Sequence, residues 1–159
     1  MKATAKAHTN IALIKYWGKR DEQFFLPTNS SLSITLDRFY TVTTVEFSED
    51  FSEDRFILNG EVMDETETQK VSRFLVRIRR LSGKKWYARV DSTNEVPTAA
   101  GFASSASGYC ALAGAACKAI GLDVNEQELS RIARQGSGSA CRSVYGGFVE
   151  WQKGEKDDG

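Results

Sequence analysis

The chain has 159 residues, a length typical of one domain, and 41% of them are hydrophobic, including nine Phe and three Trp, which is enough to fill a core. Lys plus Arg and Asp plus Glu number 21 each, and this balance argues against a general nucleic-acid-binding or acidic-membrane surface. No apolar run approaches the roughly 20 residues that cross a bilayer, and the first residues do not resemble a secretory leader. Composition therefore predicts a soluble cytoplasmic protein that binds neither nucleic acid nor membrane, with any anion specificity confined to local sites.

The cysteines and the single histidine predict neither a disulfide framework nor a metal centre. Cys110 and Cys117 lie on one expected helix, about 10 Å apart along its axis, which is too far for a disulfide. His8 lies in a strand-like run without a nearby Ser or Cys nucleophile. We therefore expect structural cysteines, a structural histidine and no metal ligands.

The first part of the chain has the β-branched enrichment and turn punctuation of antiparallel strands. Residues 4–16 predict one or two short strands, and further strands are expected at 27–36, 40–47 and 56–60. The first strand leads into Tyr16-Trp-Gly-Lys19, which places a phenol and an ammonium where a strand gives way to a loop, a common position for binding groups. On spacing alone, an ordinary surface pair is the competing interpretation.

Residues 65–81 switch to a helical period. One face of the expected helix is apolar, and it consists of Val71, Phe74, Leu75, Ile78 and Leu81. The other faces carry arginines, which we expect to be solvated: Arg73, Arg77, Arg79 and Arg80.

Residues 96–108 pack glycine, alanine and serine between an expected strand at 86–90 and an expected helix at 106–120. The loop therefore ends at a helix N-terminus, where backbone N–H groups and the helix dipole favour phosphate oxygens. Small residues let a polyphosphate approach the backbone, and the three serine hydroxyls can bind phosphate or Mg²⁺. The alternative is a small-residue turn with serine caps, and the segment lacks the Gly-Lys-Ser/Thr of a Walker loop.

The last third contains a third expected helix and a second glycine- and serine-rich stretch. Asn125 and Glu128 have capping-box spacing, and the apolar stripe that follows predicts a helix to Gln135. Residues 136–143 then carry Arg142, whose planar fork suits a carboxylate or a phosphate. A final strand is expected at 145–151.

Four segments stand out in chain order: HTNIALIKYWGK at 8–19, NSSLS at 29–33, PTAAGFASSAS at 97–107, and SGSACRS with YGGF at 137–148. Together they resemble the diphosphomevalonate decarboxylases of the GHMP kinase superfamily. The serine-rich segment alone is typical of the superfamily, whereas YWGK and SGSACR resemble the decarboxylases. The resemblance implies ATP-dependent decarboxylation of (R)-5-diphosphomevalonate to isopentenyl diphosphate in the mevalonate route to isoprenoids.

The resemblance also implies roles for individual residues, with ATP and Mg²⁺ as cofactors and a small molecule as the binding partner. Arg142 would hold the substrate carboxylate, with Asn10 positioning it, as the two groups closest to catalysis. The implied substrate site comprises Tyr16, Trp17, Gly18, Lys19, Lys70, Ser137, Gly138, Ser139, Ala140, Cys141 and Arg142. The implied ATP-phosphate loop comprises Pro97, Ala100, Gly101, Ala103, Ser104, Ser105 and Ser107.

The implied fold is α+β, of the ribosomal protein S5 domain 2-like type, with a mixed sheet and helices on one side. Family members have a second, C-terminal domain that carries the catalytic aspartate in an Asp-Ala-Gly segment, and this sequence contains no such segment. We therefore expect residues 1–159 to form an amino-terminal domain that is inactive alone, and a homodimer is compatible with the full-length form. Two alternatives stay open: a GHMP small-molecule kinase without decarboxylation, and a non-catalytic module of the same fold that binds RNA or a partner.

Overall fold

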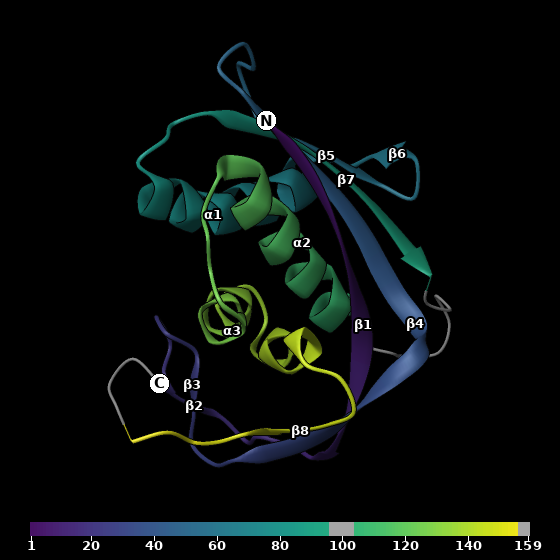
Figure 1. Ribbon diagram of the computed structural model, residues 1–159, viewed down its shortest axis with the longest axis vertical. Coiled ribbons are helices and arrows are strands. Elements are labelled where there is room, and N and C mark those ends of the chain that lie inside the picture. Colours follow the sequence, from purple (N-terminus) through teal and green to yellow (C-terminus); the bar gives the residue numbers. More distant parts are fainter. Residues whose placement is uncertain (96–103, 156–159) are drawn as a thin grey trace.

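The computed structural model describes residues 1–95 and 104–155. Within these residues a six-stranded sheet is covered by helices on one face (Figure 1). The sheet order is β1 (Lys2–Ile14), β4 (Ser31–Ser48), β7 (Tyr87–Glu95), β5 (Arg55–Leu58) and β6 (Glu61–Val62), with β8 (Phe148–Trp151) pairing with β4. The helices are α1 (Glu65–Ser82), α2 (Ser104–Ile120), α3 (Glu126–Arg134) and a 3-10 helix, η1 (Gly138–Val144). A separate hairpin consists of β2 (Lys19–Asp21) and β3 (Leu26–Pro27).

The sheet is mixed because β5 pairs with β7 in parallel, whereas β1, β7 and β8 each pair with β4 antiparallel. This arrangement confirms the α+β prediction of a mixed sheet with helices on one side. Of the helices in the described residues, none is both long and apolar enough to cross a bilayer.

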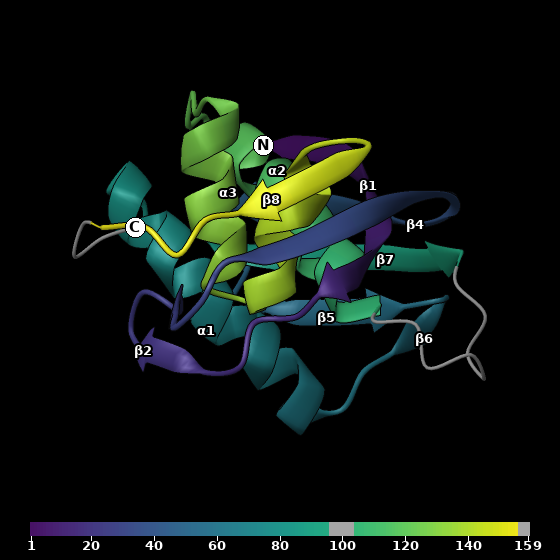
Figure 2. The ribbon, with the colours of Figure 1, turned by 90° about the horizontal axis from the view of Figure 1, so that it is seen from below.

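The long strand β4 differs from the prediction, which divided it into two strands at 27–36 and 40–47. One continuous strand passes through Asp37–Phe39 because it changes partners there instead of turning. Its first part pairs with β8, from Ser31 opposite Trp151, and its second part pairs with β7, from Tyr40 opposite Glu95. Figure 2 shows β8 lying alongside the first part of β4.

The strand β1 pairs along β4 as a single strand, with an irregularity in register between His8 and Asn10. Such a bulge reverses which side chains face the helices. Both Thr9 and Asn10 are consequently buried, although neighbours in a regular strand would face opposite sides. The bulge is the local feature that brings Asn10 to the helical face.

Helix α1 forms as its periodicity predicts. The side chain of Asp64 accepts a hydrogen bond from the backbone N–H of Glu67, and Gly83 ends the helix in the left-handed conformation, with φ of 71°. Four of the five expected apolar residues are buried. The fifth, Leu81, is 61% exposed because it lies in the last turn, away from the core.

The prediction of a solvated arginine face holds for Arg73 and Arg80 and is wrong for the other two. Arg79 forms an ion pair with the buried carboxylate of Asp54 and donates from Nε to the carbonyl of Trp86 at 2.7 Å. Arg77 donates from Nη1 to the carbonyl of Gln135 at 2.7 Å. Both guanidinium groups therefore join α1 to other parts of the fold.

Helix α2 is the central helix, and it packs on β1 and β4 through small side chains. Its buried residues include Ala111, Ala113, Ala115 and Ala116, all fully inaccessible. A Cβ added at Gly114 would lie 3.3 Å from the Cβ of Ala5, so the helix and the strand approach each other closely. Helix α3 begins with the predicted capping box, in which Asn125 and Glu128 exchange side-chain and backbone hydrogen bonds.

The three cysteines are free and buried, as expected for Cys110 and Cys117. Burial raises the pKa of Cys110 and Cys141 to about 12, and that of Cys117 to about 11. Because the thiolate is the reactive form, these thiols should be unreactive in the native chain.

We predict that at about pH 8 a chromogenic disulfide reagent labels the native chain at least ~100-fold more slowly than the chain in denaturant, where the thiol pKa returns to about 8.5. When pH rises above about 8.5, the thiols of the unfolded chain lose their protons, whereas those of the native chain keep them. The free energy of unfolding should therefore decrease as pH rises from about 8.5 towards 11. Rapid labelling of all three thiols in the native chain would contradict the buried placement.

Candidate functional site

A buried guanidinium is the centre of the candidate site. Arg142, on η1, is 3% exposed, and its Nη1 donates to the hydroxyl of Ser31 at 2.8 Å while its Nε donates to Oδ1 of Asn10 at 3.3 Å. Burial lowers its pKa, and the neighbouring Cys141 and Tyr16 act in the opposite direction. Within residues 1–95 and 104–155, no carboxylate forms an ion pair with it. A buried cation with neutral hydrogen-bond acceptors retains its positive charge for an anionic ligand.

Asn10 joins the sheet to η1. Its Nδ2 donates to the carbonyl of Ser139 at 3.0 Å and to the hydroxyl of Ser143 at 2.7 Å, while its Oδ1 accepts from Arg142. The amide therefore uses both its donor and its acceptor ends and fixes the orientation of the guanidinium. The family resemblance implied that Asn10 positions Arg142, and the structure contains a hydrogen bond between the two side chains.

The turn after β1 brings Tyr16 to the same cluster. Its ring meets the ring of Trp151 edge to face, with centroids 5.0 Å apart, and the guanidinium carbon of Arg142 lies 6.0 Å from the centroid of Trp151. A Cβ added at Gly138 would lie 2.5 Å from the hydroxyl of Tyr16, so a larger residue there would displace the Tyr16 side chain. Trp151 thus supports both Tyr16 and Arg142.

The other residues of this turn are arranged by Asn29. Its Oδ1 accepts from the backbone N–H of Trp17 at 2.9 Å, and its Nδ2 donates to the carbonyl of Lys15 at 3.0 Å. Trp17 itself is 80% exposed. Gly18, with φ of 144°, links this turn to Lys19, whose ammonium lies 3.1 Å from a carboxylate oxygen of Glu22.

The second glycine- and serine-rich stretch contains the 3-10 helix η1, which begins at Gly138 after the cap residue Ser137. Ser137 and Ser139 are half-buried with their hydroxyl oxygens 3.3 Å apart. Ala140 belongs to the hydrophobic core, and the thiol of Cys141 donates to the carbonyl of Gly138 at 3.0 Å. Ala140 and Cys141 can therefore offer a ligand only main-chain groups.

Lys70 lies apart from the Arg142 cluster. It lines a pocket of about 200 Å³ together with Ser105 and Tyr109, and Arg142, Tyr16 and Lys19 do not line that pocket. Hydrogen bonding to Glu67 raises the pKa of Lys70 and keeps it protonated. The structure therefore brings Lys70 to the serine-rich end of α2 and not to the other residues of the implied substrate site.

The predicted phosphate loop is described only in part. Pro97, Ala100, Gly101 and Ala103 lie outside the described residues, and Ser104 is the first residue of α2. Ser105 is exposed and lines the pocket beside Lys70.

Ser107 faces the sheet. It is fully buried, with its hydroxyl 3.1 Å from that of Thr9 and 2.8 Å from that of Thr41, which in turn donates to the side chain of Asn94 at 2.8 Å. This buried hydroxyl network fixes the start of α2 over β1, β4 and β7. Ser107 thus anchors the start of α2, and its place in the phosphate loop stays a prediction.

The sequence reasoning did not single out Ser31, Ser143 and Trp151 as parts of the site. The alternating pattern of β4 indicates that Ser31 is a polar residue on the buried face, but it does not reveal its partner, Arg142, which is 111 residues away. His8, expected to be structural, lies with Nδ1 3.2 Å from the carbonyl of Leu36.

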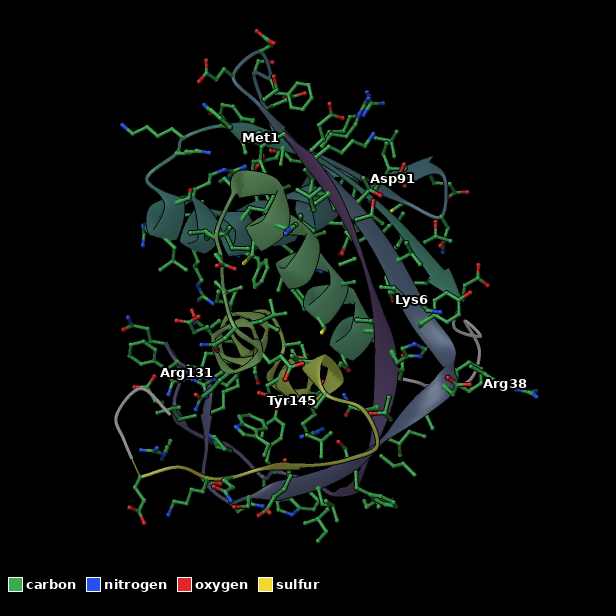
Figure 3. The ribbon with its side chains drawn as sticks, in the orientation of Figure 1. Met1, Lys6, Arg38, Asp91, Arg131 and Tyr145 are labelled. Atoms are coloured by element: carbon green, nitrogen blue, oxygen red, sulfur yellow. The ribbon has the colours of Figure 1, made fainter. Side chains whose placement is uncertain are left out.

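The opposite face of the sheet is a separate, charged surface. Figure 3 shows Lys6, Arg38 and Asp91 pointing away from the helices, whereas Tyr145 lies beside η1. All three charged residues are exposed. The candidate site is therefore confined to the helical side of the sheet.

We predict that Asn10→Ala destabilises the fold by about 2 kcal/mol, because Arg142 Nε loses a buried partner and so does Ser143. Urea unfolding at one pH measures the change. Gln23→Ala, at an exposed position, serves as the control and should stay within about 0.5 kcal/mol of the unchanged chain. An Asn10→Ala variant as stable as the control would mean that the contacts of Asn10 are not required.

Comparison with known proteins agrees with this geometry. A family model for the diphosphomevalonate decarboxylase-like N-terminal domain matches residues 7–159. The diphosphomevalonate decarboxylase of Bos taurus is 49% identical over 172 residues, with 98% of this chain and 42% of the relative covered.

Solved structures agree as well. The mevalonate diphosphate decarboxylase from Enterococcus faecalis superposes with a TM-score of 0.95 at 58% identity, over 99% of this chain and 49% of that one. A structure of MDDEF in complex with MVAPP, AMPPCP and magnesium gives 0.94 at 58% identity, over 99% and 48%. The chain thus spans less than half the length of these relatives. With the family model matching nearly all of it, the chain belongs to the diphosphomevalonate decarboxylase-like N-terminal domain family.

Proposed function

We propose that the complete protein containing this chain decarboxylates (R)-5-diphosphomevalonate to isopentenyl diphosphate in an ATP-dependent reaction. The observation that carries the proposal is the buried guanidinium of Arg142, which has neutral partners in Ser31 and Asn10 and is free to hold a carboxylate. Because the chain spans less than half of its relatives' length, the activity is assigned to the complete protein.

The substrate contains a carboxylate and a diphosphate, and the site offers cationic and polar groups for both. Arg142 would bind the carboxylate through its planar fork, oriented by Asn10. Tyr16 and Lys19 would bind the diphosphate, together with Ser137, Ser139 and the main chain at 138–141. Trp17 and Gly18 would contribute through the backbone of their turn, which Asn29 holds.

The nucleotide would bind at the start of α2. Ser104, Ser105 and the first N–H groups of the helix suit phosphate oxygens, and the residues predicted at 97–103 would complete the loop. Since Lys70 lies beside Ser105, we assign its ammonium to the nucleotide phosphates and not to the substrate diphosphate. Mg²⁺ prefers oxygen ligands and usually retains water and phosphate oxygens. The hydroxyl of Ser105, which lines this pocket, fits such an ion.

The chemistry follows from these positions. Transfer of the γ-phosphoryl group to the tertiary 3-hydroxyl converts the hydroxyl into a leaving group. When phosphate departs, C3 becomes electron-deficient, and the electron pair of the breaking C–C bond forms the double bond as CO₂ leaves. The protein supplies mainly positioning and electrostatic stabilisation, with Arg142 keeping the carboxylate aligned until it is released.

A relative has been solved with ligands of the expected kinds: MDDEF binds MVAPP, AMPPCP and magnesium. This complex supports ATP and Mg²⁺ as cofactors of the complete protein. We further propose that the complete protein acts in the cytoplasm and forms a homodimer. Cell fractionation and light scattering test these two points.

We predict that Arg142→Lys in the complete protein lowers turnover by about 10²-fold, or about 3 kcal/mol at the transition state, because lysine keeps the charge but loses two-point contact. Release of CO₂ from the 1-carboxyl group measures it, and Arg73→Lys at an exposed helix position is the matched control. A near-normal rate would make the role of Arg142 structural. A phosphorylated product without CO₂ in the unchanged protein would instead indicate a kinase.

The 159-residue chain alone should release no CO₂ above background from diphosphomevalonate with ATP and Mg²⁺. A tertiary alcohol is a poor nucleophile and requires a correctly placed base, which the family carries in an Asp-Ala-Gly segment that this sequence lacks. Robust turnover by the chain, with longer contaminants excluded by mass spectrometry, would place the base within these residues.

A further inference from the structure

Two glycines two residues apart each lie against a tyrosine ring. A Cβ added at Gly136 would lie 2.1 Å from Cδ1 of Tyr109, and a Cβ added at Gly138 would lie 2.5 Å from the hydroxyl of Tyr16. Distances this short cannot be relieved without moving a ring or the backbone. The turn at 136–138 is therefore held between two aromatic side chains from different elements.

Each tyrosine belongs to a different part of the site. Tyr109, on α2, lines the pocket beside Lys70 and Ser105, and its ring meets Phe74 edge to face with centroids 5.3 Å apart. Tyr16 lies against Trp151, which supports Arg142. The turn at 136–138 thus contacts one residue that lines the pocket, Tyr109, and one residue of the Arg142 cluster, Tyr16.

Hydrogen bonds also tie the start of this turn to α1 and α3. Arg77 on α1 donates to the carbonyl of Gln135 at 2.7 Å. The N–H groups of Gly136 and Ser137 donate to the carbonyl of Ala133, at 3.0 and 3.3 Å. Because these hydrogen bonds tie the start of the turn to α3, a displacement of the Tyr109 ring would be taken up at Gly138, where the turn meets Tyr16.

We propose that Tyr109 is a positioning residue that acts through Gly136 and Gly138 on Tyr16, so that occupancy of the pocket beside Lys70 sets the geometry of the Arg142 cluster. The path consists of direct contacts between close-packed groups, which transmit displacements because protein interiors contain few voids. The identity of the two ligands rests on the proposed function, whereas the steric link does not.

The link can be tested in the ligand-free chain by NMR. Its three tryptophans give three indole N–H signals, and Trp151→Phe assigns the one that reports on the Arg142 cluster. Gly136→Ala should shift the Trp151 signal beyond the line width and leave that of Trp86 in place. Adding Tyr109→Ala, which removes the obstructing ring, should return the signal most of the way. Gly146→Ala is the matched control, because a Cβ there meets nothing within 4 Å.

If Gly136→Ala does not fold, the variant Tyr109→Leu tests the same contact without adding an atom at Gly136. Tyr109→Leu keeps a side chain over Gly136 but loses the planar ring, and it should also shift the Trp151 signal, whereas Tyr109→Phe should not. A Trp151 signal unmoved in folded Gly136→Ala or in Tyr109→Leu would overturn the proposal. The proposal would also be overturned if the Trp151 signal shifts in Gly136→Ala and the shift is just as large after Tyr109→Ala is added.

The pocket side is tested by titrating the chain with AMPPCP and Mg²⁺. Binding to the unchanged chain should move the Trp151 signal, and in Tyr109→Leu the same occupancy should move it less than half as far. Equal movement in both chains would contradict the role of Tyr109. If AMPPCP does not bind to the chain, the titration is repeated with the complete protein; absence of binding there means that the nucleotide part of the proposed function fails, while the ligand-free shifts still decide the steric link.

Discussion

The burial of one guanidinium among neutral partners is the constraint on which the functional end of this molecule depends. Arg142 has lost almost all its water, and its hydrogen bonds go to a hydroxyl and an amide. A carboxylate partner would compensate the desolvation more fully, but it would also neutralise the charge. Ser31 and Asn10 hold the group in place while leaving its charge available, and this requirement joins β1 and β4 to η1.

Close approach between layers is the second requirement, and small side chains provide it. The alanines of α2 allow this helix to lie directly on β1 and β4, while the Ser107 network fixes its first turn. Farther along the chain, Gly136 and Gly138 admit the rings of Tyr109 and Tyr16 where any other residue would clash. Small residues therefore let one short turn contact both Tyr109, which lines the pocket, and Tyr16, which belongs to the Arg142 cluster.

Local patterns determined the helices. The apolar period of α1, the capping box of Asn125 and the small-residue run of α2 all predicted elements that the structure contains, because their hydrogen bonds form within the segment itself. The same local patterns did not predict where the strands begin and end. Asp37–Phe39 looked like a break, but β4 continues there because its partners, β8 and β7, succeed each other along one edge.

For the site, the sequence alone identified the family resemblance and the residues with suitable chemistry, including Arg142, Asn10 and Tyr16, since motifs and side-chain chemistry are visible without a fold. The tertiary structure decided which of them meet. It separated Lys70 from Arg142, turned Ser107 towards the sheet, and added Ser31 and Trp151 to the cluster. The reason is physical: the contact between Asn10 and Arg142 spans 132 residues, and it depends on a bulge and on strand register, which no local pattern specifies.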